Sequence, residues 1–168
     1  MAIDKNHFWD ENYYNHPPLT DDMLAAAEAQ LGVKLPDSLI ELLRVQNGGY
    51  TKEFIFPMQV ATSWADDHVP LETLSGIVTD ESVETAQNIM DTEYMTAEWG
   101  LPEKQVLLSG DGHWWISLDY RQGDVPSVCW LDVDEEEDIQ IAESFEAFLA
   151  GLSRKKTINI IHGRTNGA

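Results

Sequence analysis

The sequence predicts an α+β fold, a mostly antiparallel sheet with N-terminal helices and a C-terminal helix packed on it. Three observations support this expectation. Two short helical segments with clear start and stop signals occupy residues 20–46, and strand-like runs separated by glycine turns fill residues 105–131. An amphipathic segment with two phenylalanines then follows, and it can cover the apolar face of an antiparallel meander.

The first expected helix begins after Thr20, a residue type that accepts a backbone hydrogen bond at a helix N-terminus. Leu24, Ala27 and Leu31 recur at helical spacing, which predicts one apolar face. Gly32 follows, and glycine readily adopts the left-handed conformation in which many helices end. These residues therefore predict a helix with defined ends.

The second expected helix opens at Pro36, because proline is tolerated in a first turn that lacks internal N–H partners. Its apolar stripe consists of Leu39, Leu42 and Leu43. The helix is expected to end at a turn of residues that adopt positive φ at low cost, namely Asn47, Gly48 and Gly49. The pattern predicts a scaffold and requires no catalytic group.

The middle of the chain is expected to hold two short strands, a loop and a helix. Residues 53–57 and 59–61 are strand-like, and Pro57 favours an edge or a break. Residues 62–78 are interpreted as a loop. Apolar residues recur at three- and four-residue spacing over 79–99, which predicts a helix there.

The second half is expected to be a meander followed by a helix. Strands over 105–109 and 113–118 flank Gly110 and Gly112, a strong hairpin signal, and a further strand is expected over 127–131. The closing helix has an apolar stripe of Phe145, Phe148, Leu149 and Leu152.

The order of these motifs resembles the SUKH superfamily. The string LGVKLPD at residues 31–37 precedes an apolar helix and the Asn-Gly-Gly turn. Sequences similar to the second half of that family stand at residues 110–115, 127–132 and 141–149, so the resemblance spans roughly 19–152. The superfamily contains fungal regulators of cell-wall synthesis and many bacterial immunity proteins that neutralise secreted toxins. The resemblance implies a protein-binding domain without enzymatic activity.

The net charge of −20 limits the choice of partners. Thirty acidic and only six basic residues precede Arg154, a difference of −24 over residues 1–153. Such a field repels phosphate backbones, so nucleic-acid binding is not expected, whereas a protein with a basic surface would be attracted. Acidic proteins can also simply be soluble, without any charged partner.

Chain length and composition predict one domain over residues 1–153, with residues 1–18 as an N-terminal extension. The basic tail over 154–168 is left open as an edge strand, a disordered segment or an extension on the acidic body. No membrane-length apolar run is present and Cys129 has no possible intrachain partner, so we expect a cytoplasmic protein without a membrane segment.

Acidic residues in two predicted loops, together with one tryptophan, form the candidate partner interface. A tryptophan pair in a strand puts one ring on each face, so an exposed ring could anchor an interface. The candidate residues are Asp66, Asp67, Asp132, Asp134, Glu135, Glu136, Glu137, Asp138 and Trp114. A calcium loop starting at Asp132 is disfavoured, because Glu137 stands where an EF-hand requires glycine.

No catalytic, metal or cofactor-binding residues are predicted. Cys129 lies in an apolar strand without electropositive neighbours, so a Cys129–His113 nucleophile and base is disfavoured. The five histidines lack metal-ligand spacing. Three functions therefore remain open: an immunity protein acting by steric and electrostatic occlusion, a regulatory interaction module in cell-wall or envelope control, and a carboxylate-based hydrolase.

Overall fold

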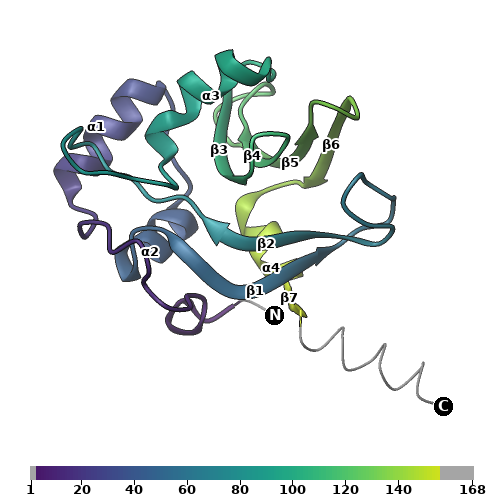
Figure 1. The fold of residues 1–168 in the computed structure, drawn as a ribbon, viewed down its shortest axis with the longest axis horizontal. Helices are drawn as coiled ribbons and strands as arrows, with labels where there is room; N and C mark the ends of the chain where they lie inside the picture. Colours follow the sequence, from purple (N-terminus) through teal and green to yellow (C-terminus); the bar gives the residue numbers. More distant parts are fainter. Residues whose placement is uncertain (1–2, 156–168) are drawn as a thin grey trace.

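Two antiparallel sheets form the body of the fold, which a computed structural model describes for residues 3–155 (Figure 1). The three-stranded sheet has the order β2-β1-β7 and consists of β1 (Gly49–Pro57), β2 (His68–Leu74) and β7 (Ser153–Arg154). The four-stranded sheet is a meander of β3 (Gln105–Gly110), β4 (Trp114–Asp119), β5 (Ser127–Asp132) and β6 (Glu137–Ala142). The predicted α+β class is confirmed, with two sheets in place of one.

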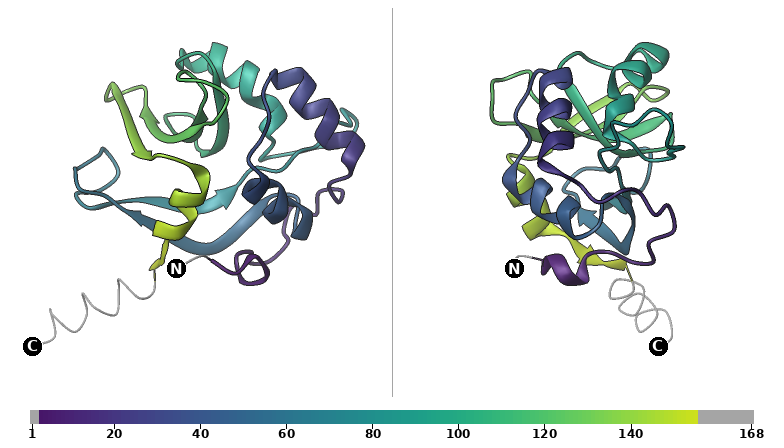
Figure 2. Two further views of the ribbon diagram at one scale, coloured as in Figure 1. Left: turned by 180° about the vertical axis from the view of Figure 1, so that it is seen from behind. Right: turned by 90° about the vertical axis from the view of Figure 1, so that its left-hand side faces the viewer.

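Helices lie beside and between the sheets (Figures 1 and 2). They are α1 (Asp21–Leu31), α2 (Asp37–Val45), α3 (Thr92–Trp99) and α4 (Phe145–Gly151), with 3₁₀ turns η1 (Lys5–His7) and η2 (Ile89–Asp91). Helix α4 contacts β1, β5, β6 and α2, so it fills the angle between the two sheets. No helix within residues 3–155 has the length and apolar character needed to cross a membrane.

The two sheets meet where β2 ends beside β3. Ser75 N donates to Leu108 O at 2.8 Å, and the Thr73 and Ser109 hydroxyls lie 3.1 Å apart. The sheets diverge beyond this junction, which leaves room for the side chains of α4.

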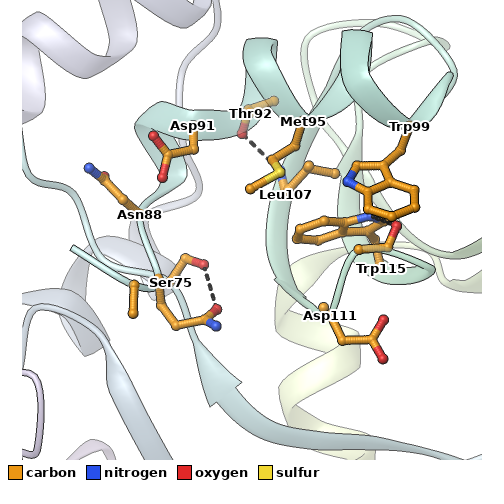
Figure 3. Close-up of a pocket in the computed structure, with 13 residues that line it drawn as sticks. Ser75, Asn88, Asp91, Thr92, Met95, Trp99, Leu107, Asp111 and Trp115 are labelled. Atoms are coloured by element: carbon orange, nitrogen blue, oxygen red, sulfur yellow. Dashed lines mark hydrogen bonds between the residues drawn. The ribbon is translucent and has the colours of Figure 1, made fainter.

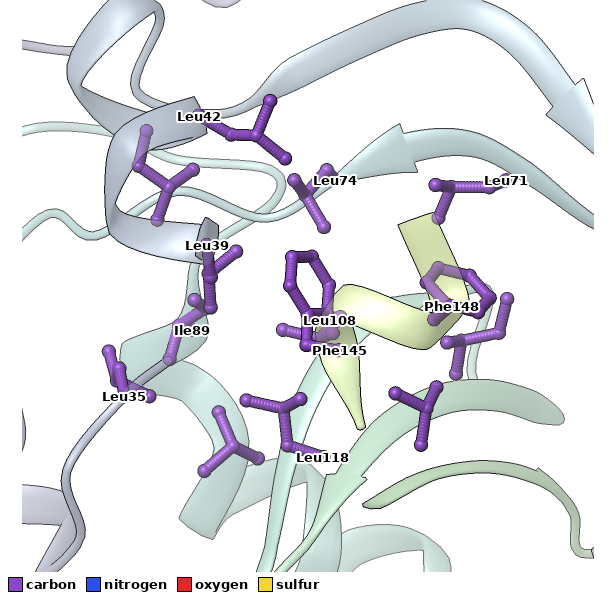
Figure 4. Close-up of a cluster of buried hydrophobic side chains, with 14 of the residues drawn as sticks. Leu35, Leu39, Leu42, Leu71, Leu74, Ile89, Leu108, Leu118, Phe145 and Phe148 are labelled. Atoms are coloured by element: carbon purple, nitrogen blue, oxygen red, sulfur yellow. The ribbon is translucent and has the colours of Figure 1, made fainter. Parts of the chain in front are cut away.

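The main core lies between the sheets and α2 (Figure 4). Phe145 and Phe148 of α4 are buried, and the Phe148 ring stacks on Phe56 with centroids 5.0 Å apart. Leucines from α2, β2, β3 and β4 surround these rings: Leu39, Leu42, Leu71, Leu74, Leu108 and Leu118. Full burial of one such side chain contributes about 1.5–3 kcal/mol, so this cluster holds the sheets together.

A smaller apolar cluster covers the other face of the four-stranded sheet. Its buried members are Leu101, Leu107, Trp115, Cys129 and Leu131, and Met95 and Trp99 of α3 pack against them. Trp114 contacts the main core instead, because side chains alternate along β4. The two neighbouring tryptophans therefore point to opposite faces, as the strand pattern predicts.

The Asn47-Gly48-Gly49 turn joins distant segments. Asn47 Nδ2 donates to the carbonyls of Pro17 and Ile77 at 2.8 and 2.7 Å, and its Oδ1 accepts from Ile77 N at 2.8 Å. Gly48 has φ +89°, and a Cβ there would lie 2.4 Å from Gly76 N. Only glycine fits this close backbone approach, so the turn fixes the start of β1 against the segment after β2.

The N-terminal extension is part of the core. Phe8 is fully buried and Trp9 nearly so, and Trp9 Nε1 donates to Leu42 O at 2.9 Å. Phe8 O also accepts from Lys52 N at 3.0 Å, which holds the extension beside β1.

Three predictions for the middle of the chain were wrong. The strand expected over 59–61 is absent, because these residues belong to the connection between β1 and β2. Residues 62–78 were expected to be a loop, but β2 occupies part of this range, with Val69 and Leu71 buried. Pro70 lies within β2, which is an edge strand of its sheet, where a missing N–H is tolerated.

The helix expected over 79–99 begins only at Thr92. Before it, Asn88 Oδ1 accepts from Val78 N and Met90 N, both at 3.1 Å. Ile89 N donates to Gly76 O at 2.8 Å. These bonds favour a non-helical backbone, because an asparagine side chain can replace helical partners.

The acidic segment 132–138 was expected to be a loop leading to the last helix, but β6 begins at Glu137. The edge position of β6 tolerates its exposed charged residues. Of the basic tail, Arg154 belongs to β7, and Lys155 Nζ lies 3.1 Å from Glu72 Oε1. Residues 156–168, the rest of that predicted tail, lie outside the described residues.

Candidate interaction surface

Side-chain hydrogen bonds join the loop at residues 58–67 to the β5–β6 hairpin, and this contact connects the two predicted acidic segments. Ser63 Oγ donates to Asp132 Oδ2, and Ser63 N donates to Glu137 Oε1 at 2.9 Å. One serine thus connects the β1–β2 hairpin of one sheet with the β5–β6 hairpin of the other.

Three tryptophans form a stack beside this contact. The Trp114 ring lies nearly parallel to Trp130, with centroids 5.1 Å apart and an interplanar angle of 14°. Trp64 meets Trp114 edge-on at 5.4 Å and 61°. Trp130 is fully buried and Trp64 is 43% exposed, so the stack runs from the core to the solvent. Such a supported, exposed aromatic ring is the usual anchor of a protein interface.

Asp132 stabilises the β5–β6 turn. Its carboxylate is buried, and Oδ1 accepts from the backbone N–H groups of Asp134 and Glu135, each at 3.0 Å. Because Oδ2 also accepts from Ser63, the carboxylate is fully engaged in holding the turn and the loop together.

Glu137 and Asp138 are also engaged by neighbouring side chains. Trp130 Nε1 donates to Glu137 Oε1 at 3.0 Å. Arg121 donates two hydrogen bonds to Asp138, at 2.7 and 2.9 Å, in a bidentate pair. These carboxylates are therefore less free to meet a partner than their sequence context predicts.

Arg121 also pairs with Asp119 in a polar network on the face of the four-stranded sheet against which α3 packs. Burial alone raises the pKa of Asp119, but hydrogen bonds from Arg121, Gln105 and Cys129 outweigh it and lower the pKa to about 2. Burial first, and then the Asp119 charge, raises the pKa of the Cys129 thiol to about 12. A thiol of this kind is a poor nucleophile.

Asp66 and Asp67 follow Trp64 in the same loop, and Asp134, Glu135 and Glu136 follow Asp132, which pairs with Trp114 across β4 and β5. We define the acidic tryptophan surface as Trp64, Trp114, Asp66, Asp67, Asp134, Glu135 and Glu136. Asp134 Oδ2 lies 2.7 Å from His113 Nδ1, and Asp67 Oδ1 lies 2.8 Å from His68 Nδ1. The surface thus combines an aromatic centre with a rim of acids, which suits a partner carrying apolar and basic groups.

Sequence reasoning missed two residues of this arrangement. Trp64 was assigned only to a loop, although a large aromatic residue between polar neighbours was a usable signal of an anchor. Ser63 gave no signal, because its role depends on a contact with residues about seventy positions away.

Within residues 3–155, no three His, Cys, Asp or Glu side chains are grouped so that they could hold an ion.

The protein is an α+β scaffold that presents an aromatic and acidic patch from the β1–β2 and β5–β6 connections. A model of the SMI1 / KNR4 family (SUKH-1) matches residues 18–151, and the chain belongs to that family. No curated protein matches the chain. Membership is consistent with an immunity or a regulatory domain. The match begins after the N-terminal extension, so Phe8 and Trp9 add core residues outside the matched range.

Proposed function

We propose that the protein is a non-enzymatic immunity protein, which neutralises a secreted bacterial toxin by covering its active surface. The observation that carries this proposal is the acidic tryptophan surface, in which distant segments present an exposed aromatic ring within a rim of carboxylates. Toxins that act on nucleic acids need a basic groove for phosphates, and an acidic protein surface can occupy the same groove. Family membership supports a binding role of this kind.

A toxin domain encoded beside the gene provides the direct test. We expect saturating wild-type protein to abolish the toxin's activity and Trp64→Ala to weaken binding by at least about tenfold, as for an interface hot spot. Tyr13→Ala is the matched control, because Tyr13 is an exposed aromatic residue of the N-terminal extension, outside the surface. Full toxin activity at saturating protein would refute the proposal.

The electrostatic part has its own test. Replacing Asp66, Glu135 and Glu136 with their amides removes three rim charges but none of the hydrogen bonds that hold the turn. The association rate should fall more than the dissociation rate rises, and it should fall steeply with salt for the wild type. The control variant loses the same charge elsewhere, at Glu11, Asp22 and Glu41. Equal slowing by both variants would show that net charge and not this rim steers the encounter, and an association rate insensitive to salt would leave recognition to shape alone.

A regulatory interaction module in cell-wall or envelope control is the second candidate, and family membership supports it equally. Gene neighbourhood separates the two, because constitutive expression without an adjacent toxin gene favours regulation. A hydrolase would need two neighbouring carboxyl groups with raised pKa values. Within residues 3–155, Asp91 alone has a clearly raised carboxyl pKa, caused by burial.

A further inference from the structure

A pocket opens between α3 and the turn that joins β3 to β4 (Figure 3). Its volume is about 270 Å³. Pockets for whole small molecules measure about 300–1,000 Å³, so this one suits a single amino-acid side chain better than a cofactor. Exposed Ala86 and Asp111 lie among its lining residues, while buried Leu107 and Trp115 form its apolar part.

Aromatic rings and carboxylates both line the pocket. Figure 3 shows the Trp99 and Trp115 rings at one end of the pocket with Asp111 below them, and Asp91 at the far end beside Asn88. None of the thirteen described lining residues is Lys, Arg or His. Two acids and two indoles without a basic residue make a pocket that favours a positive charge, since cations are attracted both to carboxylates and to aromatic faces.

Asp91 is the lining carboxylate that lacks a partner. Its carboxylate is half-buried and makes no hydrogen bond or ion pair with any other residue of the described chain. Burial raises the pKa of the Asp91 carboxyl group. An incoming cation would supply the missing partner, whereas the nearby Asp111 Oδ1 already accepts from His113 N at 3.0 Å.

The tryptophan wall depends on the glycine turn. Gly112 has φ +110°, and a Cβ there would lie 2.9 Å from the Trp99 ring. Trp115 Nε1 donates to Gly112 O at 3.1 Å, which fixes the second ring. The Gly110–Gly112 hairpin signal in the sequence therefore has a second consequence: it lets both rings lie directly against the backbone.

The pocket adjoins the acidic tryptophan surface. Trp99 contacts the His113 ring at a centroid distance of 5.1 Å, and His113 pairs with Asp134 at 2.7 Å. Asp134 of that surface is thus linked through His113 to the edge of the pocket, although Trp114 and Trp115 lie on opposite faces of the sheet.

We infer that this pocket receives an arginine or lysine side chain of the basic partner, with Asp91 as the counter-charge and Trp99 as the aromatic wall. The inference rests on the proposed binding function and names the partner's anchor within it. Net charge, the lack of a basic lining residue and continuity with the surface all favour a protein side chain over a free amine.

N-acetylarginine amide is the probe, and titration followed by the indole N–H signals in NMR spectra is the measurement. The amide should bind with millimolar affinity and shift the signals of Trp99 and Trp115. Asp91→Asn keeps the shape and removes the charge, so it should weaken binding by about tenfold, the effect of one lost charge-assisted bond. Glu98→Gln is the matched control, because Glu98 is an exposed acid of α3 outside the pocket. N-acetyllysine amide, in a parallel titration, tells which of the two cations is preferred.

N-acetylcitrulline amide, neutral and nearly identical in shape to the arginine probe, should not bind. Equal binding of the arginine and citrulline amides, equal binding by the wild type and Asp91→Asn, or no binding of either cation would each overturn the inference. The probe needs no partner, so binding of the probe together with an unaffected toxin would refute the proposed function alone. A captured toxin that binds Asp91→Asn as tightly as the wild type would refute the anchor alone.

Discussion

Replacing Asp132 with alanine should destabilise the protein, although this residue belongs to the segment with the most acidic residues. The substitution removes two hydrogen bonds to the turn amides of Asp134 and Glu135 and one from Ser63. Bonds to a charged acceptor contribute about 1.5–3 kcal/mol each when buried. Here water can replace part of the turn bonds, because Asp134 and Glu135 are exposed. Relief of repulsion among the neighbouring acids subtracts a further ~0.5 kcal/mol.

The expected loss for Asp132→Ala is therefore about 2–3 kcal/mol in the free energy of unfolding. In urea, with a slope near 2 kcal/mol/M, this lowers the unfolding midpoint by about 1 M. Asp132→Asn keeps an acceptor for the turn amides and should lose only about 1 kcal/mol. Glu135→Ala is the control, because its side chain is exposed and should change stability by less than about 0.5 kcal/mol.

Urea unfolding followed by tryptophan fluorescence measures all three variants. If the midpoint of Asp132→Ala coincides with that of Glu135→Ala, the carboxylate does not hold the turn, and the reasoning that separates structural from exposed acids fails. If Asp132→Ala instead changes the slope of unfolding free energy against urea concentration, the substitution has altered the compactness of the native or denatured state and not the strength of the turn.

Three further predictions concern a carboxylate with a lowered pKa, a turn residue with positive φ and the buried cysteine. The low folded pKa of Asp119, about 2 against a reference value of 3.8, gives stability that is present above pH 4 and lost as pH falls towards 2. Urea unfolding at several pH values over this range measures the effect. The free energy of unfolding of the wild type should fall by about 2 kcal/mol, and that of Asp119→Asn should not show this fall. Glu136 has φ +54°, so Glu136→Gly should raise the free energy of unfolding by about 0.5–1 kcal/mol in the same assay, while Glu135→Gly should not. The raised pKa of Cys129 and its burial predict no labelling by a thiol reagent at mildly alkaline pH until denaturant unfolds the protein, and rapid native labelling would contradict the description of its environment.

Local signals in the sequence were sufficient where one segment determines its own structure. Thr20 caps α1 and Gly32 ends it with φ +69°, and the Gly110–Gly112 signal corresponds to the turn between β3 and β4. The prediction failed where distant segments decide. Residues 79–91 have helical spacing, but backbone bonds to Gly76 and the side chain of Asn88 override it.

In the candidate surface, too, local sequence predicts the exposed acids but not the acids that distant residues engage. Asp66, Glu135 and Glu136 are exposed, as acids in connections generally are. Asp132 and Glu137 have identical sequence signals but are engaged by Ser63, a residue whose nearness depends on how the two sheets pack. A pattern of charges cannot distinguish these cases, because burial and hydrogen bonding are properties of the packed chain.

The loop at residues 58–67 has a consequence for how this scaffold can diversify. Met58 N donates to Asp67 O at 2.7 Å, which closes the loop at its base, and β1 and β2 pair next to this bond. Beyond that closure, Ser63 donates hydrogen bonds to Asp132 and Glu137, and Trp64 packs on Trp114. Insertions and substitutions within the loop would thus alter the surface offered to a partner and leave the core residues in register. Related chains can therefore acquire new partners through this loop while the strand pairing and the core stay the same.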